Sequence, residues 1–219
     1  MSIQSALQTI KSKLPENVTL VAVSKTKPTA DLREAYVAGQ RIFGENKIQE
    51  MAEKWEAMPK DIQWHMIGHV QTNKVKFMAP FVNLIHGVDS LKLLEEINKQ
   101  AKKNNRIIDC LLQIYIAEEE TKFGLDEIEL NEILSSATFQ ELKNIRIVGL
   151  MGMATFTDNQ EQIKKEFTHL KTIFDNTNQL LTSNFQLLTL SMGMSGDYKF
   201  AIECGSTMVR IGSSIFGNR

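Results

Sequence analysis

The sequence predicts an α/β fold, a single (β/α)8 TIM barrel, on three observations. Short apolar, β-branched runs alternate with longer segments of helical period, which is the pattern of βα units around a parallel sheet. There are eight such runs, the strand count of this barrel, and 219 residues lie within its size range. No Gly/Ser/Pro-rich linker, composition break or internal repeat divides the chain, so we expect one domain over residues 1–219. An open doubly wound sheet is the alternative.

The predicted strands are short runs rich in Val, Ile, Leu and Phe that end at glycine, proline or polar residues. The first reads Thr-Leu-Val-Ala-Val and cannot extend far, because Pro28 lacks the N–H that a strand ladder needs. In chain order the runs cover residues 19–23, 41–43, 63–67, 84–87, 109–114, 147–151, 187–191 and 208–211.

Between the strands, apolar residues recur at spacings of three and four, which predicts amphipathic helices. In chain order these cover residues 29–38, 47–57, 72–78, 90–104, 125–136, 159–182 and 197–203. Residues 1–14 also predict an amphipathic helix, and lack the charged and then apolar pattern of a secretion signal.

Charge and cysteine content exclude several classes of protein. The formal net charge is −1 and the chain has no Lys/Arg-rich block, so a nucleic-acid-binding surface is not expected. No apolar stretch approaches the ~20 residues that span a bilayer, so we expect a cytoplasmic protein that does not bind a membrane. Cys110 and Cys204 lack metal-ligand spacing and are too few for a disulfide scaffold, so both are expected to be reduced.

Lys25 follows the first predicted strand directly, which puts it at the active face of a barrel. Its four-carbon stem can lie among apolar neighbours, while burial disfavours the ammonium and lowers the lysine pKa from a reference near ~10.4. A neutral lysine amine forms Schiff bases with carbonyl compounds. The alternative is a lysine that merely flanks the strand in solvent.

The loops after the last two strands are rich in Gly and Ser, and in TIM barrels these loops form the usual phosphate site. The N–H groups of Gly212 and Ser213, at the start of the terminal helical turn, would face an anion. The hydroxyls of Ser191 and Ser195 would add hydrogen bonds. Gly/Ser turns also cap helices in general, which is the alternative here. Together with a lysine at a strand end, the pattern indicates one ligand that carries both a phosphate and an aldehyde.

Six segments in chain order share one resemblance. They are 21–28 (Val-Ala-Val-Ser-Lys-Thr-Lys-Pro), 43–46 (Phe-Gly-Glu-Asn), 64–74 (Trp-His-Met-Ile-Gly-His-Val-Gln-Thr-Asn-Lys), 149–154 (Gly-Leu-Met-Gly-Met-Ala), 190–197 (Leu-Ser-Met-Gly-Met-Ser-Gly-Asp) and 205–212 (Gly-Ser-Thr-Met-Val-Arg-Ile-Gly). On these residues the chain resembles the pyridoxal phosphate homeostasis proteins, which bind pyridoxal 5′-phosphate (PLP) and are similar in fold to the N-terminal domain of alanine racemase. The resemblance implies a barrel of that type, with PLP held as a Schiff base by Lys25. Lys27 precedes Pro28 and should already have left the barrel mouth.

The resemblance also implies that Arg210 lies against the pyridine nitrogen of PLP. A guanidinium cannot accept a proton, so the ring nitrogen stays unprotonated and the cofactor is a poorer electron sink than one paired with a carboxylate. Such a site favours holding PLP over carbanion chemistry. An ion pair with a carboxylate such as Glu203 is the alternative for Arg210.

The rest of the expected site follows from the same resemblance, which places the phosphate among Ser191, Gly212 and Ser213. Asn46 would hydrogen-bond near the cofactor ring, with capping of the next helix as the alternative. Methionines near strand ends would cover the apolar faces of the cofactor or fill gaps in the core. The predicted cofactor-binding residues are Lys25, Asn46, Ser191, Met192, Gly193, Arg210, Gly212 and Ser213.

Three functions stay open. The resemblance implies a non-catalytic protein of intracellular vitamin B6 homeostasis, a monomer or weak homodimer whose partners are PLP and apo PLP-dependent enzymes. The alternative is a racemase-like PLP-dependent enzyme acting on amino acids. It needs a second acid or base, and the three tyrosines are expected to pack in the core or on the surface. A Schiff-base aldolase would need a lysine in the later strands, which contain none. His65 is expected to be a hydrogen-bonded barrel residue, and His69 to lie at the pocket rim.

Overall fold

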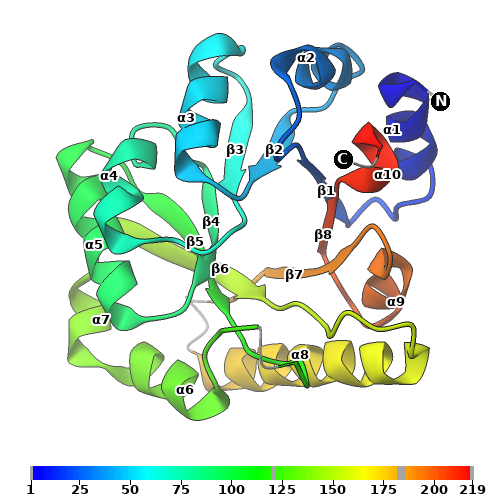
Figure 1. The fold of residues 1–219 in the computed structure, drawn as a ribbon. Coiled ribbons are helices and arrows are strands. Elements are labelled where there is room, and N and C mark those ends of the chain that lie inside the picture. The colour runs from blue at the N-terminus through cyan, green and yellow to red at the C-terminus, as the bar shows by residue number, and fades with distance from the viewer. Residues whose placement is uncertain (1, 120–121, 182–185, 218–219) are drawn as a thin grey trace.

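The structure, a computed structural model, describes residues 2–119, 122–181 and 186–217. Eight strands form a closed parallel barrel in the order β1-β2-β3-β4-β5-β6-β7-β8, and β1 pairs with both β2 and β8 (Figure 1). The predicted (β/α)8 barrel is thereby confirmed. The strands are β1 (Thr19–Val23), β2 (Ile42–Glu45), β3 (Gln63–Met66), β4 (Leu84–Val88), β5 (Ile108–Gln113), β6 (Ile145–Met151), β7 (Thr189–Met194) and β8 (Met208–Ile211).

The helices lie around the outside of the barrel (Figure 1). They are α1 (Ile3–Lys11), α2 (Thr29–Val37), α3 (Ile48–Ala57), the 3-10 helix η1 (Thr72–Lys74), α4 (Val75–Met78), α5 (Leu91–Lys103), α6 (Glu127–Ser135), α7 (Ala137–Glu141), α8 (Gln160–Leu180), α9 (Tyr198–Glu203) and α10 (Ser213–Phe216). The first and last of them, α1 and α10, pack against each other beside the β1–β8 pair that closes the barrel (Figure 1).

Most predicted elements appear with small shifts of their ends, and β1 and β8 have the predicted bounds. The seventh strand begins and ends later than the sequence predicts, at Thr189–Met194 in place of residues 187–191. The chain stays in β7 as far as Met194, because a register shift between Ser191 and Met194 keeps it paired with β8 while Gly193 adopts φ +97°. The sequence does not predict the short helix α7. Its N-cap is Ser136, whose side chain accepts a hydrogen bond from the Phe139 N–H. Thr182, the predicted end of the long helix, lies outside the described residues.

Apolar side chains form two cores. The larger lies between barrel and helices and includes the largest fully buried side chains, Trp64, Phe43 and Phe167. Because successive strand residues point to opposite faces, a second apolar set fills the barrel interior. It consists of Val21, Leu84, Leu111, Met151 and Met208.

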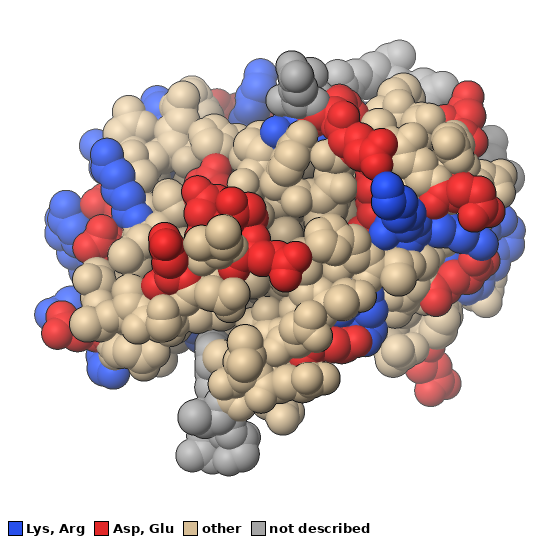
Figure 2. Space-filling view, turned by 90° about the horizontal axis from the view of Figure 1, so that it is seen from below, with Lys and Arg blue, Asp and Glu red and all other residues tan. Residues whose placement is uncertain are grey.

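The outer surface carries charges of both signs. On the face seen from below, Lys and Arg side chains lie interspersed with Asp and Glu, and no continuous basic area crosses it (Figure 2). In the described part of the chain, no helix is long and apolar enough to cross a membrane. Cys110 is buried and Cys204 is partly buried, and both are free thiols.

Candidate functional site

A cleft of about 730 Å³ opens at the carboxyl ends of the strands, the face on which the barrel geometry predicts a site. Nearly every strand-end loop contributes to its wall. Its lining includes Val23, Lys25, Lys27, Asn46, Ile67, His69, Gln113, Lys122, Phe123, Met153, Thr155, Phe156, Met194, Ser195, Asp197, Arg210, Gly212 and Ser213. A cavity of similar size, about 720 Å³, lies beside α6, α7 and α8, but no residue of the predicted site lines it.

Lys25 lies half-buried in a turn directly after β1. The Lys27 N–H donates to the Ser24 backbone oxygen at 3.1 Å, and Thr26 occupies the third turn position with φ +65°. Type II turns need a positive φ there and normally use glycine. The prediction that Lys27 leaves the barrel mouth is wrong: Lys27 also lines the cleft, because its Nζ reaches back to donate to the Phe216 backbone oxygen at 3.0 Å.

Arg210 forms a polar floor for the cleft and is only 4% exposed. Its Nη1 donates to the backbone oxygen of Ser191 at 2.9 Å and to the hydroxyl of Ser191 at 2.7 Å, and its Nη2 donates to the Gly152 oxygen at 3.1 Å. A guanidinium has five N–H groups, so Nε–H and one Nη2–H have no acceptor among the described residues. Burial lowers the pKa of Arg210 to about 10, while the nearby carboxylate of Asp197 acts to raise it. With this pKa, Arg210 is charged at neutral pH. Glu203, its alternative partner, instead pairs with Lys164 at 3.0 Å.

Two buried histidines continue the polar contacts below Arg210. His86 Nδ1 lies 3.1 Å from Ser191 Oγ, and His86 Nε2 lies 3.1 Å from His65 Nδ1. His86 is on β4 and Ser191 is on β7, so this contact crosses the barrel interior. Burial lowers the pKa of His65 to about 3 and holds the pKa of His86 well below its usual value, so both rings are neutral at pH 7. His65 is therefore the hydrogen-bonded barrel residue that the sequence predicts.

Beside Lys25, the loops after β7 and β8 meet, since β8 pairs with β1. The Gly212 N–H donates to the Ser195 hydroxyl at 3.2 Å, which leaves the Ser195 O–H hydrogen to donate elsewhere. Ser213 starts α10, and the first N–H groups of a helix lack intrahelical acceptors. Gly212 is packed closely: a Cβ there would lie 3.0 Å from the Val23 backbone oxygen. This side of the cleft therefore offers small polar donors without side-chain bulk.

Five of the eight predicted site residues line the cleft together: Lys25, Asn46, Arg210, Gly212 and Ser213. The N-cap of α3 is Lys47 without a side-chain hydrogen bond, so Asn46 does not occupy the capping position. The other three lie elsewhere. Ser191 is inside the barrel below Arg210, Met192 is in the outer core, and a Cβ on Gly193 would lie 2.6 Å from the Ala201 Cβ. Their roles at a cofactor remain predictions.

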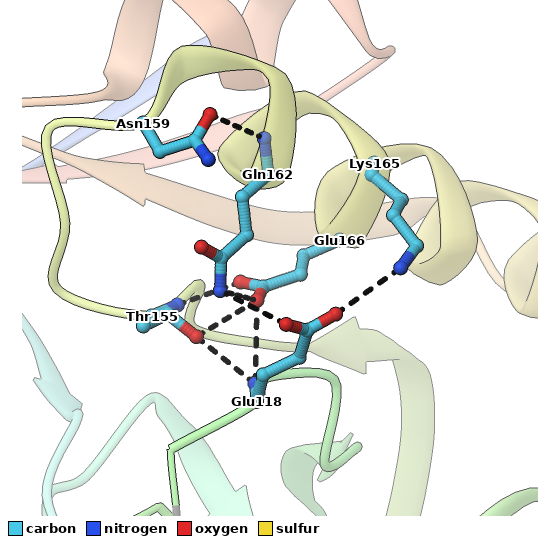
Figure 3. A network of polar contacts seen from close by, with 6 residues as sticks. All are labelled: Glu118, Thr155, Asn159, Gln162, Lys165 and Glu166. Atoms are coloured by element: carbon cyan, nitrogen blue, oxygen red, sulfur yellow. Dashed lines mark hydrogen bonds and ion pairs between the residues drawn. The ribbon is translucent and has the colours of Figure 1, made fainter.

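Sequence reasoning missed how the loops after β5 and β6 are tied together. Glu166, on α8 and 3% exposed, accepts from the N–H and hydroxyl of Thr155, both at 2.7 Å, and from the Glu118 N–H at 3.3 Å (Figure 3). Thr155 lines the cleft, so a buried carboxylate fixes one wall of the site. The sequence does contain a sign of this buried carboxylate, because Glu166 lies at helical spacing within the apolar stripe of Ile163, Phe167 and Leu170.

The cleft rim carries further predicted and unpredicted side chains. His69 lines the cleft as expected. Its ring packs edge to face with the Phe123 ring, with 4.9 Å between the ring centroids. Lys122 pairs with Glu119 at 3.3 Å. No tyrosine lines the cleft in the described part of the chain: Tyr36 donates to Asp61 at 2.9 Å on the outer surface, and Tyr198 packs against the outer core.

The whole described barrel has counterparts among known proteins. A family model described as alanine racemase, N-terminal domain, matches residues 2–219. PipY of Synechococcus elongatus PCC7942, solved with PLP bound, is 34% identical with a TM-score of 0.88, over 98% of this chain and 100% of that chain. Alanine racemase of Clostridium difficile 630 with cycloserine is similar in fold, with a TM-score of 0.83 at 15% identity, over 100% of this chain and 60% of that chain. The fold and the cleft thus define a barrel of the alanine racemase N-terminal-domain type.

Sequence similarity narrows this class. The pyridoxal phosphate homeostasis protein of Aquifex aeolicus (strain VF5) is 41% identical over 201 residues, which cover 91% of this chain and 86% of the relative. The chain belongs to the pyridoxal phosphate homeostasis protein family, as the resemblance of its motifs predicts.

Proposed function

We propose that this chain holds PLP in the cleft as a Schiff base on Lys25 and acts, without catalysing a reaction, in intracellular PLP homeostasis and cofactor supply. One observation carries the proposal: Arg210, buried at the floor of the cleft that Lys25 lines, keeps two N–H groups without a protein acceptor among the described residues. The family, and the PLP bound to PipY, support the same ligand.

The cleft residues match the chemical groups of PLP. A volume of about 730 Å³ lies within the usual range for small-molecule sites. Arg210 offers donors suited to an unprotonated ring nitrogen, while the Ser195 hydroxyl and the Ser213 N–H offer donors suited to a phosphate. Asn46 would orient the ring from the loop after β2.

Bound there, PLP supplies an aldehyde that a lysine amine links covalently and reversibly. Arg210 can only donate, so it stabilises the unprotonated ring nitrogen and weakens the electron withdrawal that amino-acid chemistry requires. These features favour retention and release of PLP over turnover.

In this proposal the recipients are apo PLP-dependent enzymes, and the chain works in the cytoplasm as a monomer or weak homodimer. Reversibility is the chemical requirement for such a role, because a carrier must give up the aldehyde that it protects. A single, reversible covalent bond to Lys25, with the other proposed contacts made by hydrogen bonds, meets that requirement.

Borohydride reduction of the PLP-loaded protein, followed by peptide mass spectrometry, tests the covalent site. We expect a pyridoxyl-phosphate adduct on Lys25 that is lost in Lys25→Ala and kept in Lys27→Ala. Lys27 is the matched control, because it lines the same cleft two residues away while its Nζ reaches the Phe216 oxygen. An adduct that persists in Lys25→Ala, or none in the wild type, would contradict the proposal.

Deuterium exchange separates a carrier from an enzyme. The PLP-loaded protein is mixed with amino acids in deuterium oxide, and exchange at the α-carbon is followed by NMR. We expect no exchange beyond that of free PLP at the same concentration. Faster exchange that disappears in Arg210→Ala or Lys25→Ala would instead identify a PLP-dependent enzyme acting on amino acids.

A further inference from the structure

A buried ion cluster lies directly behind the turn that carries Lys25. Lys54 of α3 is 5% exposed, and its Nζ donates to the Ser24 backbone oxygen at 2.7 Å, to Glu45 Oε1 at 2.8 Å and to Glu50 Oε1 at 2.7 Å. An ammonium has three N–H groups, so these contacts use all of them. The cluster therefore has no donor left for a ligand and acts on the protein itself.

The same cluster forms hydrogen bonds with the residues on both sides of Lys25. Ser24 donates its hydroxyl to Glu45 Oε1 at 2.6 Å, and the Thr26 N–H donates to Glu50 Oε1 at 2.6 Å. With the Lys54 bond to the Ser24 oxygen, the backbone before and after Lys25 is anchored to α3. Lys25 is the residue between these anchors.

The turn needs such an anchor because of Thr26. Thr26 has φ +65°, a conformation that is a genuine outlier for a β-branched residue. Strained residues persist only when the surroundings over-determine them, and they cluster at functional sites. The bond from Thr26 N–H to Glu50 fixes the strained residue itself.

The cluster is also costly to bury. Glu45 is 0% exposed, its Oε2 has no hydrogen-bond partner among the described residues, and burial raises its pKa. Buried ion pairs of this kind contribute little to stability compared with apolar residues of similar volume. A role in fixing geometry accounts for the cluster better than a role in stabilising the fold.

We propose that Lys54, held between Glu45 and Glu50, is a positioning residue that locks the Ser24–Thr26 turn and thereby aims Lys25 into the cleft. The inference rests on the proposed function, since it concerns how Lys25 is presented to PLP. Without the lock, Thr26 relaxes toward negative φ and the direction of Lys25 changes. The cleft floor and the phosphate side, built from β7, β8 and α10, stay as they are.

A double-mutant cycle with PLP as the probe tests this positioning role. Lys54→Met keeps the length of the side chain and removes its three bonds. We expect it to lower the equilibrium constant for the Lys25-dependent absorption change roughly tenfold, the effect of relaxing one strained residue. In the Lys25→Ala background, Lys54→Met should leave the remaining PLP binding unchanged. Lys99→Met, which removes the exposed Lys99–Glu96 pair on α5, is the matched control. It should leave PLP binding unchanged in the wild-type background and in the Lys25→Ala background.

A rescue variant adds a readout that a purely structural role would not move. Glycine adopts positive φ without strain, so Thr26→Gly combined with Lys54→Met should recover most of the lost covalent binding. In the protein without PLP, the Thr26 and Lys27 amides should exchange with deuterium faster in Lys54→Met while the barrel strands stay protected. If Lys54→Met does not fold, Glu50→Ala carries the test, because it removes the Thr26 acceptor from a partly exposed position on α3.

The outcomes separate the two proposals. No Lys25 adduct in the wild type would reject the proposed function, and the amide exchange would still report on the turn. A Lys54→Met variant with wild-type covalent binding and wild-type exchange at Thr26 overturns the positioning role. The positioning role is also overturned if Lys54→Met reduces PLP binding equally in the wild-type and Lys25→Ala backgrounds. Equal losses would mean that the cluster supports the whole cleft and does not act through Lys25.

Discussion

Arg210 Nη1 lies 2.7 Å from Ser191 Oγ inside the barrel, and the same hydroxyl lies 3.1 Å from His86 Nδ1. Ser191 thus joins the guanidinium at the cleft floor to a histidine on the opposite side of the barrel. The contact fixes Arg210 from below and leaves its two remaining N–H groups for the cleft. It also assigns Ser191 a place under the site rather than at its surface.

Ser191→Ala should weaken PLP binding and lower stability together. Arg210 keeps the Ser191 backbone oxygen and Gly152, so we expect PLP affinity to fall only roughly three- to tenfold. The buried His86 Nδ1 loses its partner, which should cost about 1–3 kcal/mol of unfolding free energy. Equilibrium dialysis and urea unfolding measure the two effects.

Ser206→Ala is the matched control for that variant. Ser206 is also buried, but its hydroxyl lies against the backbone oxygens of Leu190, Met192 and Met208 and does not contact Arg210. We expect it to lower stability and leave PLP affinity intact. Equal losses of affinity in both variants would show that barrel packing, and not the Arg210 contact, sets PLP binding.

The buried histidines predict acid sensitivity. The folded-state pKa of His65 is about 3 and that of His86 is also depressed, while unfolded histidine titrates near ~6.5. The unfolded state therefore binds more protons as pH falls below ~6.5, and the unfolding free energy decreases by about 1.4 kcal/mol per pH unit for each histidine. Urea unfolding between pH 7 and pH 4 measures this slope.

A double variant isolates the histidine contribution. Burial raises the pKa values of Glu45 and Asp197, and a raised carboxyl pKa acts in the opposite direction, adding stability as pH falls. The pH slope of the unfolding free energy is measured for the wild type and for the double variant His65→Leu/His86→Leu. The difference between the two slopes removes the carboxyl contribution, which both proteins share. A difference near zero from pH 6 to pH 4 would mean that the rings are already charged in the folded state.

The sequence was sufficient for the barrel and for the residues at the ends of β1 and β8, because strand and helix periods are local and strand ends have one fixed place in this fold. Lys25, Gly212 and Ser213 were predicted that way, whereas Arg210 was predicted from the family resemblance. The places of Ser191, Met192 and Gly193 were not, because they depend on the register shift between β7 and β8. His86 was overlooked although it is a polar residue between Ile85 and Gly87 in a predicted buried strand. Its partner is on β7, which no local pattern indicates.

Glu166→Ala should loosen the cleft wall formed by the loop after β6. The change leaves the Thr155 N–H and hydroxyl without their carboxylate acceptor (Figure 3). We expect faster deuterium exchange at Glu118 and Thr155, and faster PLP release, while the strands keep their protection. Lys165→Ala is the control, because it removes only the exposed Lys165–Glu118 pair, for which about 0–1 kcal/mol is expected. Unchanged exchange at Thr155 in Glu166→Ala would show that the loop is held by other contacts.

Gly212→Ala should weaken PLP binding by displacing the start of α10, where the proposed phosphate contacts lie. The new Cβ would lie 3.0 Å from the Val23 backbone oxygen and 3.2 Å from Val23 Cβ, so β8 and α10 must move away from β1. Gly196→Ala is the matched control in the adjoining loop, because its Cβ would meet nothing within 4 Å. We expect a PLP affinity loss of roughly tenfold or more in Gly212→Ala, the effect of about 1–3 kcal/mol of overpacking, and little change in Gly196→Ala. Competition with inorganic phosphate distinguishes the cause of the affinity loss. A variant that has lost contacts to the phosphate group of PLP should also bind inorganic phosphate more weakly, so that inorganic phosphate no longer inhibits PLP binding. If Gly212→Ala kept that inhibition, the phosphate would have to be bound away from the start of α10.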